Sequence, residues 1–336
     1  MSKKIINKLY FIFFFSLVIP LLYSGCRTND NNPVIPPPPV TSLSSVFSVM
    51  PVDKQYVAGN FSVKDQNNNP VTGLQSVNIT AALYWSSKNI KDSCNGNVNI
   101  SSNNNRKIAA ALTMDYSGSM GLPDGVYIRM MKSGVRTYIS AMHSNDIAEI
   151  IKYDDDVVVV CPLTSDKLLL NRAVDSLDYN FSGLTSLYQS ITQAVNDVAA
   201  VSDSQFIRTV VAFTDGIEGS SGITRDSMIK SAKRNAIPVY SVGFYNDTAG
   251  QYGWKDLKNI SDTTGAFVFW ADSKDTSGPG LNNIYSKIYK LLSESYSIKI
   301  EFPCGSTIPS GTLCEITFKV TYYNNVCNYY YSYLMP

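Results

Sequence analysis

The amino-acid sequence predicts an α/β protein with a doubly wound, mostly parallel sheet flanked by helices. It also predicts an accessory β-sandwich, built from the strands on either side of that region. Residues 108–114 form an uncharged, mostly apolar run, which is typical of a strand buried on both faces. Residues 206–213 repeat this pattern, and helical and strand-like segments alternate between residues 106 and 295. Residues 46–105 and 296–336 instead show the alternation of half-buried strands.

Length and charge indicate the number of domains and exclude one class of partner. The chain has 336 residues, 44% of them hydrophobic, so it has room for about two domains. The 28 basic residues and 27 acidic residues give a net charge of +1. If a leader carrying Lys3, Lys4 and Lys8 is removed, 25 basic residues remain against 27 acidic ones, for a net charge of −2. We therefore expect no nucleic-acid partner.

Residues 1–25 predict a secretory signal peptide. A lysine-bearing start precedes the apolar residues 9–22, a run too short to span a bilayer comfortably. The junction Leu22-Tyr23-Ser24-Gly25-Cys26 resembles a bacterial lipobox, although Tyr23 departs from the usual aliphatic residue. This resemblance implies that Cys26 is acylated and anchors the protein to a membrane of the bacterial cell envelope. Arg27 after the anchor resembles lipoproteins routed to the outer membrane. An ordinary cleaved signal, with Cys26 as a disulfide partner, is the alternative.

The segment after Cys26 predicts a tether and then a small β-rich module. Residues 26–45 are rich in Asn and Pro, and residues 36–39 are all proline, which favours an extended, semi-rigid spacer. Residues 46–105 alternate apolar and polar side chains between turn residues, as half-buried strands do. Residues 91–105 are rich in Ser, Asn and Gly, so we expect a loop there, with Cys94 in it.

The central region, residues 106–295, predicts alternating helices and strands. Asp124 is expected to cap a helix over residues 124–142. Strands at 146–153 and 157–161 are joined by three aspartates, and a turn that short makes them antiparallel. Helices are further expected at residues 165–177, 186–201, 224–235, 254–261 and 282–293, and strands at 238–244 and 266–270.

Asp115, Ser117 and Ser119 follow the first buried strand in the pattern Asp-x-Ser-x-Ser. The strand should deliver this turn to the carboxyl edge of the sheet, where open α/β sheets bind ligands. A carboxylate and two hydroxyls are hard oxygen donors, which suit magnesium or calcium better than zinc or copper. The same residue types also make ordinary turns and helix caps.

Two further loops extend this pattern: residues 183–187, with Thr185, and residues 214–216, with Asp215. With the Asp115 turn, they resemble the von Willebrand factor type A domain with a complete metal-ion-dependent adhesion site, over residues 106–293. The second loop departs from the usual Gly-Gly-Thr, since Leu184 stands before the threonine. The resemblance implies that five residues hold a divalent cation: Ser117 and Ser119 directly, Thr185 directly or through water, and Asp115 and Asp215 directly or through waters.

The resemblance also implies a vacant coordination position for a carboxylate from a partner. Neutral hydroxyls and only two carboxylates leave a divalent cation under-neutralised, so an incoming Asp or Glu gains a charge-assisted bond. We therefore expect a protein partner that presents Asp or Glu. Mg²⁺ is the expected cation, with Ca²⁺ and Mn²⁺ as alternatives.

Residues 296–336 again alternate apolar and polar side chains, and we expect them to pack with residues 46–105. Cys304, Cys314 and Cys327 are close in sequence and are candidates for one disulfide, whose connectivity stays open. Cys161 ends a predicted strand and is expected to be a buried free thiol. Zinc binding is disfavoured, because there is no Cys-x-x-Cys pair and no histidine near these cysteines.

Three functions remain open. The first is a metal-dependent protein-binding or adhesion module on an envelope lipoprotein, and the second is a structural envelope protein whose metal only stabilises loops. The third is a phosphoryl-transfer enzyme that uses Asp115 and Asp215. That chemistry usually places a second acid two residues after the first, where this chain has Ser117, and His143 is the sole histidine for a Ser-His-Asp arrangement. We therefore expect no enzymatic activity.

Overall fold

The computed structural model describes residues 39–87, 90–121, 124–177, 183–202, 204–215, 218–245, 250–272 and 279–336. Residues from Val40 to Pro336 form one unit. The predicted signal peptide, Cys26 and most of the predicted tether lie outside the described residues, so those expectations remain predictions. Among the helices of the described ranges, none has the length and apolar character needed to cross a membrane.

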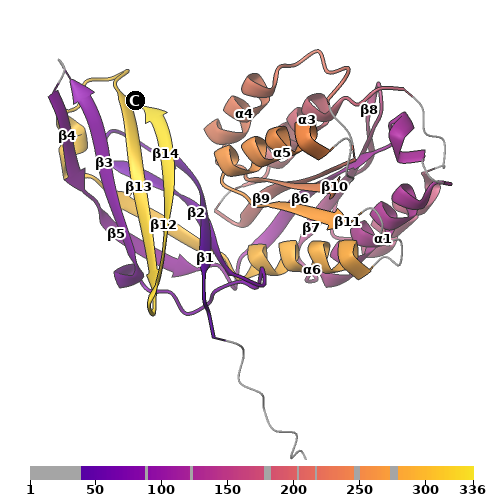
Figure 1. Ribbon diagram of the computed structural model, residues 1–336, viewed down its shortest axis with the longest axis horizontal. Coiled ribbons are helices and arrows are strands. Elements are labelled where there is room, and N and C mark those ends of the chain that lie inside the picture. The colour runs from indigo at the N-terminus through magenta and orange to yellow at the C-terminus, as the bar shows by residue number, and fades with distance from the viewer. Residues whose placement is uncertain are drawn as a thin grey trace, which may run out of the picture. The chain divides into compact units, whose positions relative to one another are not determined.

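The central sheet has six strands in the order β11-β10-β9-β6-β7-β8 (Figure 1). All neighbouring strands are parallel except β7 and β8, which are antiparallel, as the short aspartate turn predicted. The strands span β6 Lys107–Asp115, β7 Ile147–Tyr153, β8 Val157–Thr164, β9 Phe206–Thr214, β10 Val239–Tyr245 and β11 Val268–Asp272. The predicted doubly wound α/β fold is confirmed.

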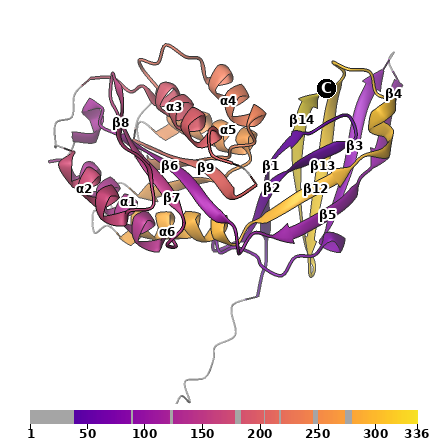
Figure 2. The ribbon, with the colours of Figure 1, turned by 180° about the vertical axis from the view of Figure 1, so that it is seen from behind.

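Helices cover both faces of this sheet (Figures 1 and 2). Ala110 and Leu112 of β6 pack in one core with α1 and α6, whereas Ala111 between them packs in another with α3. Because side chains alternate along a strand, a continuous apolar run serves both cores. The helices are α1 Val126–Ala141, α2 Lys167–Ser176 and α6 Pro279–Ser293 on one face, and α3 Leu187–Ala199, α4 Arg225–Arg234 and α5 Gly250–Thr264 on the other.

Two expectations about helices were wrong. Asp124 does not cap α1: Gly125 occupies the N-cap position with φ 69°, and Asp124 itself has φ 51°. Two successive residues in the left-handed region turn the chain sharply before the helix, and glycine adopts that conformation without steric cost. The helix expected over residues 254–261 is longer, since α5 begins at Gly250 and ends at Thr264.

The flanking segments form two four-stranded sheets, as predicted (Figure 1). One sheet has the order β1-β2-β12-β5 and the other β14-β13-β3-β4, so each mixes strands from both ends of the chain. Phe47 stacks on Phe61 at 4.9 Å and on Phe318 at 4.1 Å between ring centroids, which joins the two sheets through one aromatic core. The strands span β1 Leu43–Pro51, β2 Tyr56–Asp65, β3 Ile79–Ser87, β4 Ile90–Asn95, β5 Asn97–Ser102, β12 Tyr296–Glu301, β13 Leu313–Tyr322 and β14 Asn325–Leu334.

The loop expected over residues 91–105 is mostly strand, which corrects the sequence prediction. β4 pairs with β3 and β5 pairs with β12, each at the edge of its sheet. Along β5, exposed side chains alternate with half-buried ones. An edge strand tolerates such polar residues because only part of its surface is covered, and its composition therefore resembles that of a loop.

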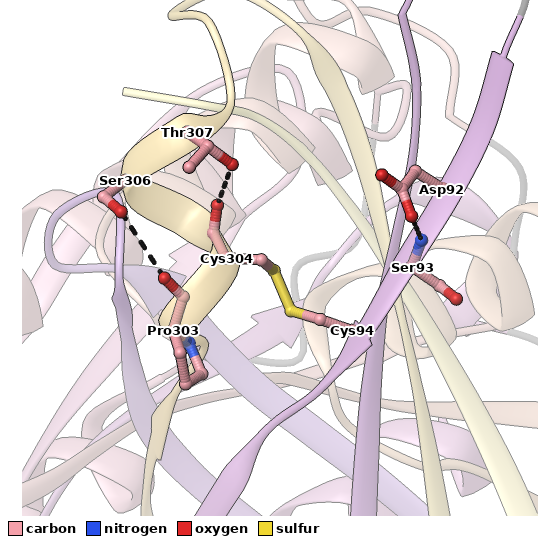
Figure 3. Close-up of a disulfide and its surroundings, with 7 residues drawn as sticks. All are labelled: Asp92, Ser93, Cys94, Pro303, Cys304, Ser306 and Thr307. Carbon is pink, nitrogen blue, oxygen red and sulfur yellow. Dashed lines mark hydrogen bonds between the residues drawn. A yellow bond between two sulfur atoms is a disulfide. The ribbon is translucent and has the colours of Figure 1, made fainter.

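The disulfide also differs from the expectation. Cys304 pairs with Cys94, across 210 residues of sequence and with 6.3 Å between Cα atoms (Figure 3). Cys94 lies on β4 and Cys304 in the 3₁₀ turn Pro303–Thr307. Cys314 and Cys327 are free thiols. Cys161 is free and buried, as predicted.

The positions of the two thiols explain why they do not pair with Cys304. Cys314 is fully buried on the inner face of β13, between Trp85 and Tyr333 of the neighbouring strands. Cys327 lies on β14 and contacts the hydroxyl of Ser45, with 3.2 Å between sulfur and oxygen. Closeness in sequence therefore gave the wrong set of candidates, because strand alternation and strand order decide which thiols meet.

Candidate functional site

The candidate site lies where β6 and β9 end, side by side in the sheet. Asp115 is the last residue of β6 and is fully buried, and Thr214 is the last residue of β9. The Thr214 hydroxyl donates a hydrogen bond to Asp115 Oδ2 at 2.6 Å. Because the two strands are parallel, their carboxyl ends bring Asp115 and Asp215 to the same edge, as the sequence predicted.

The first loop connects these two aspartates through its serines. The backbone N–H of Ser117 donates to Asp115 Oδ1 at 2.8 Å. The Ser119 hydroxyl donates to Asp215 Oδ1 at 2.8 Å and lies 3.3 Å from the Ser117 hydroxyl. A 3₁₀ turn, Gly118–Gly121, shapes this loop. Four of the five predicted residues are therefore joined in one hydrogen-bonded chain.

Thr185, the fifth residue, lies on a loop held between the other two. The backbone N–H of Gly118 donates to the Gly183 carbonyl at 3.2 Å, and the N–H of Gly219 donates to the Thr185 carbonyl at 2.9 Å. Thr185 is 6% exposed. None of the described hydrogen bonds runs from its hydroxyl to the other four residues. The structure thus brings the three loops together and places Thr185 through its backbone.

Sequence reasoning missed Asp155, which anchors the second loop. Its Oδ1 accepts the N–H of Leu184 at 2.8 Å, and its carbonyl accepts the Ser186 hydroxyl at 2.9 Å. Gly183 has φ 82°, and a Cβ there would collide with the Asp155 carboxylate. The three aspartates at 154–156 predicted a turn, but nothing in the sequence indicated which loop that turn would touch.

Sequence reasoning also missed Glu218, which caps α3 from a distant part of the chain. Ser186 is the N-cap residue of α3 but its side chain makes no capping bond. Instead, Glu218 Oε2 accepts the N–H of Tyr188 at 2.9 Å, and the Ser221 hydroxyl accepts the N–H of Gln189 at 3.0 Å. Glu218 Oε1 also accepts the N–H of Ser221 at 2.6 Å. Free N–H groups at a helix start need such partners, but sequence signals only those supplied locally.

The surroundings of the two aspartates disfavour their charged forms. Burial raises the pKa of Asp115. Burial, and then the nearby charge of Asp115, raise the pKa of Asp215 to about 7. Neither aspartate takes part in an ion pair of the described residues. Two carboxylates this close, in a water-poor environment, favour either a proton or a cation between them.

This donor chemistry fits a hard divalent cation. The described residues contain no group of three or more His, Cys, Asp or Glu side chains that could hold a metal ion. A cation here would therefore depend on hydroxyl oxygens as well as on the two carboxylates. Such an all-oxygen set suits magnesium, calcium or manganese and lacks the nitrogen and sulfur ligands that zinc and copper prefer.

His143 lies away from this site. It sits between α1 and β7, at the amino end of β7, whereas Asp115 and Asp215 follow the carboxyl ends of their strands. Its backbone N–H donates to Asp146 Oδ2 at 2.8 Å and its ring packs edge-on against Tyr289. This histidine therefore does not form a Ser-His-Asp arrangement with the serines of the first loop.

One curated relative and two solved structures are similar to this chain. A curated relative from Borreliella burgdorferi, described as an uncharacterized protein, is 25% identical over 136 residues, which cover 39% of each chain. The solved structure of proximal thread matrix protein 1 from the mussel byssus is 16% identical with a TM-score of 0.50, over 60% of this chain and 49% of that one. A von Willebrand factor type A protein from Catenulispora acidiphila is 13% identical with a TM-score of 0.47, over 85% and 75%.

The family of the chain follows from a match to a family model. This chain spans less than half the length of the Borreliella relative and of the byssus protein. The model of the von Willebrand factor type A domain matches residues 111–286, more than half of the 336 residues, and that range contains all three loops of the candidate site. The chain therefore belongs to the von Willebrand factor type A domain family.

Proposed function

We propose that this protein is a protein-binding module whose interaction depends on a divalent cation. Asp115, Ser117, Ser119, Thr185 and Asp215 would hold the cation, with Mg²⁺ first and Ca²⁺ or Mn²⁺ as alternatives. When bound, the cation would supply a positively charged site for an oxygen anion. The observation that carries the proposal is the pair of carboxylates, Asp115 and Asp215, which take part in no described ion pair. They are joined through the backbone N–H of Ser117 and the hydroxyls of Ser117 and Ser119.

The same donors account for the expected partner. Asp115 and Asp215 would neutralise a divalent cation only in part, because their charge is shared with hydrogen bonds from Thr214 and Ser119. A carboxylate from another protein gains more from such a cation than a neutral oxygen does. Ser119 is exposed and Asp215 is partly exposed, so the site is open to an incoming side chain. We infer that the partner presents Asp or Glu.

The cellular setting is a further proposal and rests on residues 1–26 alone. We propose that Cys26 is acylated and anchors the module in the outer membrane of a bacterial envelope. Metabolic labelling with a fatty-acid probe tests this: the full chain should be labelled and Cys26→Ser should not. Equal labelling of both proteins would contradict the anchor.

Calorimetry tests the cation site directly. Titration of MgCl₂, CaCl₂ or MnCl₂ into the protein should show saturable binding, and Asp115→Ala should abolish it. Thermal unfolding in EDTA should show that Asp115→Ala is still folded. If the folded protein takes up none of the three cations, the proposal is wrong.

A second experiment separates binding from a purely structural role of the cation. Envelope proteins should be captured by the immobilised protein in MgCl₂ and released by EDTA, with Asp115→Ala as the control. A cation that raises the Tm but changes no capture would favour the structural role. Turnover of a phosphate ester such as p-nitrophenyl phosphate, lost in Asp115→Ala, would instead indicate the phosphoryl-transfer enzyme, which the serine at position 117 disfavours.

A further inference from the structure

Two adjoining cavities follow the last strand, β14, on the side where it meets α4 and α5. The larger has a volume of about 680 Å³ and the smaller about 440 Å³. Lys233, Tyr331 and Ser332 line both, so the cavities adjoin. We call the two together the β14 groove. It runs past the residues of β14 from Cys327 to Leu334.

The β14 groove is strongly cationic in a chain that is nearly neutral. The chain as a whole has 28 basic and 27 acidic residues, so the excess in the groove is local. Among the described residues that line the groove, Asp262 is the one carboxylate, and it already bonds Lys258. Five cationic side chains line the groove: Lys64, Lys230, Lys233, Arg234 and Lys258.

Two of these lysines lie against aromatic rings, and neither takes part in an ion pair of the described residues. Lys64 Nζ lies 4.2 Å from the ring centroid of Phe267, and burial lowers the pKa of Lys64 to about 8. Lys64 Nζ also donates to Asn68 Oδ1 at 2.6 Å. Lys233 Nζ lies 4.5 Å from the ring of Tyr331 and donates to the Ser332 carbonyl at 2.9 Å. Burial also lowers the pKa of Lys233. An anion in the groove would restore the compensation that these ammonium groups lose on burial.

The wall of the groove is an edge strand. β14 pairs with β13 and is the terminal strand of its sheet, so its other side pairs with no strand among the described residues. On that side the Ser332 carbonyl accepts Lys233 Nζ, which a bound strand would have to displace. An unpaired strand edge presents backbone N–H and C=O groups that pair readily with another extended chain. A glycan would use the positive charge but has no backbone to continue the sheet. An extended peptide uses both features.

We propose that the β14 groove binds an extended acidic peptide segment of a partner protein, which adds as a strand to β14 and places its carboxylates against the lysines. This surface is distinct from the cation site. Lys233 and Arg234 are in the last turn of α4, which leads to the amino end of β10, whereas Asp115 and Asp215 follow the carboxyl ends of their strands. The two surfaces therefore lie at opposite ends of the central sheet.

Fluorescence anisotropy with a labelled peptide tests the proposal. The probe is a peptide of about eight residues in which Glu and Val alternate. At a rise of about 3.3 Å per residue, an added strand of this length extends along β14 from Cys327 to Leu334. It should bind saturably, and the matched peptide with Lys in place of Glu should not. Lys230→Gln/Arg234→Gln should weaken binding about tenfold through lost charge-assisted contacts, and Lys64→Gln should do so independently. Lys230 and Arg234 are exposed, so their replacement should leave the Tm unchanged.

Matched controls show whether the peptide binds through charge alone, through strand addition to β14, or at the cation site. Lys91→Gln/Lys299→Gln removes two exposed lysines elsewhere and should leave the affinity unchanged. N-methylation of alternate backbone amides, in either register, should abolish binding in one register. Binding should persist in EDTA and in Asp215→Asn. Loss in EDTA, equal binding of both methylated peptides, or tighter binding of polygalacturonate than of the peptide would each overturn the proposal, and so would absence of saturable binding.

Discussion

Glu218, on the third loop of the candidate site, accepts the backbone N–H of Tyr188 in the first turn of α3, at 2.9 Å. Thr185 stands immediately before the N-cap residue of that helix, and its carbonyl accepts the N–H of Gly219. The second and third loops are therefore joined by two hydrogen bonds, and each side accepts one of them. Because Thr185 and Asp215 lie on these two loops, their separation is set before any cation binds.

The first prediction concerns the hydrogen bonds that Glu218 accepts between the two loops. In Glu218→Gln, the amide keeps one acceptor, but its NH₂ group would face N–H donors of Tyr188 or Ser221. We expect a loss of about 1–3 kcal/mol in the free energy of unfolding, because a part-buried donor is left without an acceptor. We also expect weaker cation binding, because Thr185 and Asp215 lose their fixed separation. Chemical denaturation and calorimetric titration of MgCl₂ measure the two effects.

A matched variant separates this effect from the mere loss of a negative charge. Glu315 is exposed on the outer face of β13, so Glu315→Gln should change neither the unfolding free energy nor the cation affinity. If Glu218→Gln behaves like Glu315→Gln, the contact between the loops does not position the site.

The second prediction is a trade between stability and cation binding at Asp215. Burial and the charge of Asp115 both disfavour a second carboxylate there. Asp215→Asn removes that repulsion, so in EDTA the variant should have a higher Tm than the wild type. In MgCl₂ the order should reverse, because the variant lacks a charged ligand. Thermal unfolding in both buffers checks this, and a variant with a lower Tm in EDTA would contradict it.

The sheet and the candidate site were predictable from sequence because both depend on local patterns. The apolar runs at 108–114 and 206–213 became β6 and β9 with bounds that differ by one residue. Buried parallel strands must be apolar on both faces, and this requirement leaves a strong signal. Once the strands are placed, the residues that follow them fall at one edge of the sheet. Asp115, Ser117, Ser119 and Asp215 lie there.

The features that sequence reasoning missed are contacts between distant segments or polar strands. Asp155 bonds Leu184 and Ser186 across 29 and 31 residues of sequence, and Glu218 bonds Tyr188 across 30. Such contacts hold the second loop but leave no local sequence pattern. β4 and β5 were predicted as a loop, because edge strands carry the Ser and Asn that also occur in loops. Cys94 lies on β4, so the error about that strand also hid the disulfide.

The third prediction is a pH dependence centred on Glu149. This residue is 2% exposed on β7, and its Oε1 has no hydrogen-bond partner. Burial, and then the charge of Asp197, raise the pKa of Glu149 to about 8. The folded state therefore holds this proton more tightly than the unfolded state. Its stabilising contribution is full below the ordinary pKa of 4.5 and is lost as the pH rises toward 8.

Glu149→Gln tests this, because the amide stays neutral at every pH. Wild type and variant should have similar Tm values at a pH near 5, and the variant should be more stable at a pH near 8.5, by an amount on the order of 2–4 kcal/mol. Asp197→Asn removes the second cause and should shrink the difference between the two pH values. If the stability of wild type and of Glu149→Gln depends on pH in the same way, ionisation of Glu149 does not destabilise the folded state, and the prediction is wrong.

The fourth prediction concerns the disulfide between Cys94 and Cys304, which closes a loop with a sequence separation of 210 residues. It joins β4 to the turn after β12, and these elements belong to different sheets of the sandwich. Its loss should lower the unfolding free energy by about 2–5 kcal/mol, because the unfolded chain regains the freedom that the crosslink removes. Cys94→Ser and Cys304→Ser should therefore lower the Tm equally, and the double variant should lower it no further.

Cys327→Ser, at a half-buried free thiol, is the control and should not reproduce this loss. Peptide mapping without reductant should recover Cys94 and Cys304 linked, and a linked Cys304–Cys314 or Cys304–Cys327 peptide would contradict the pairing.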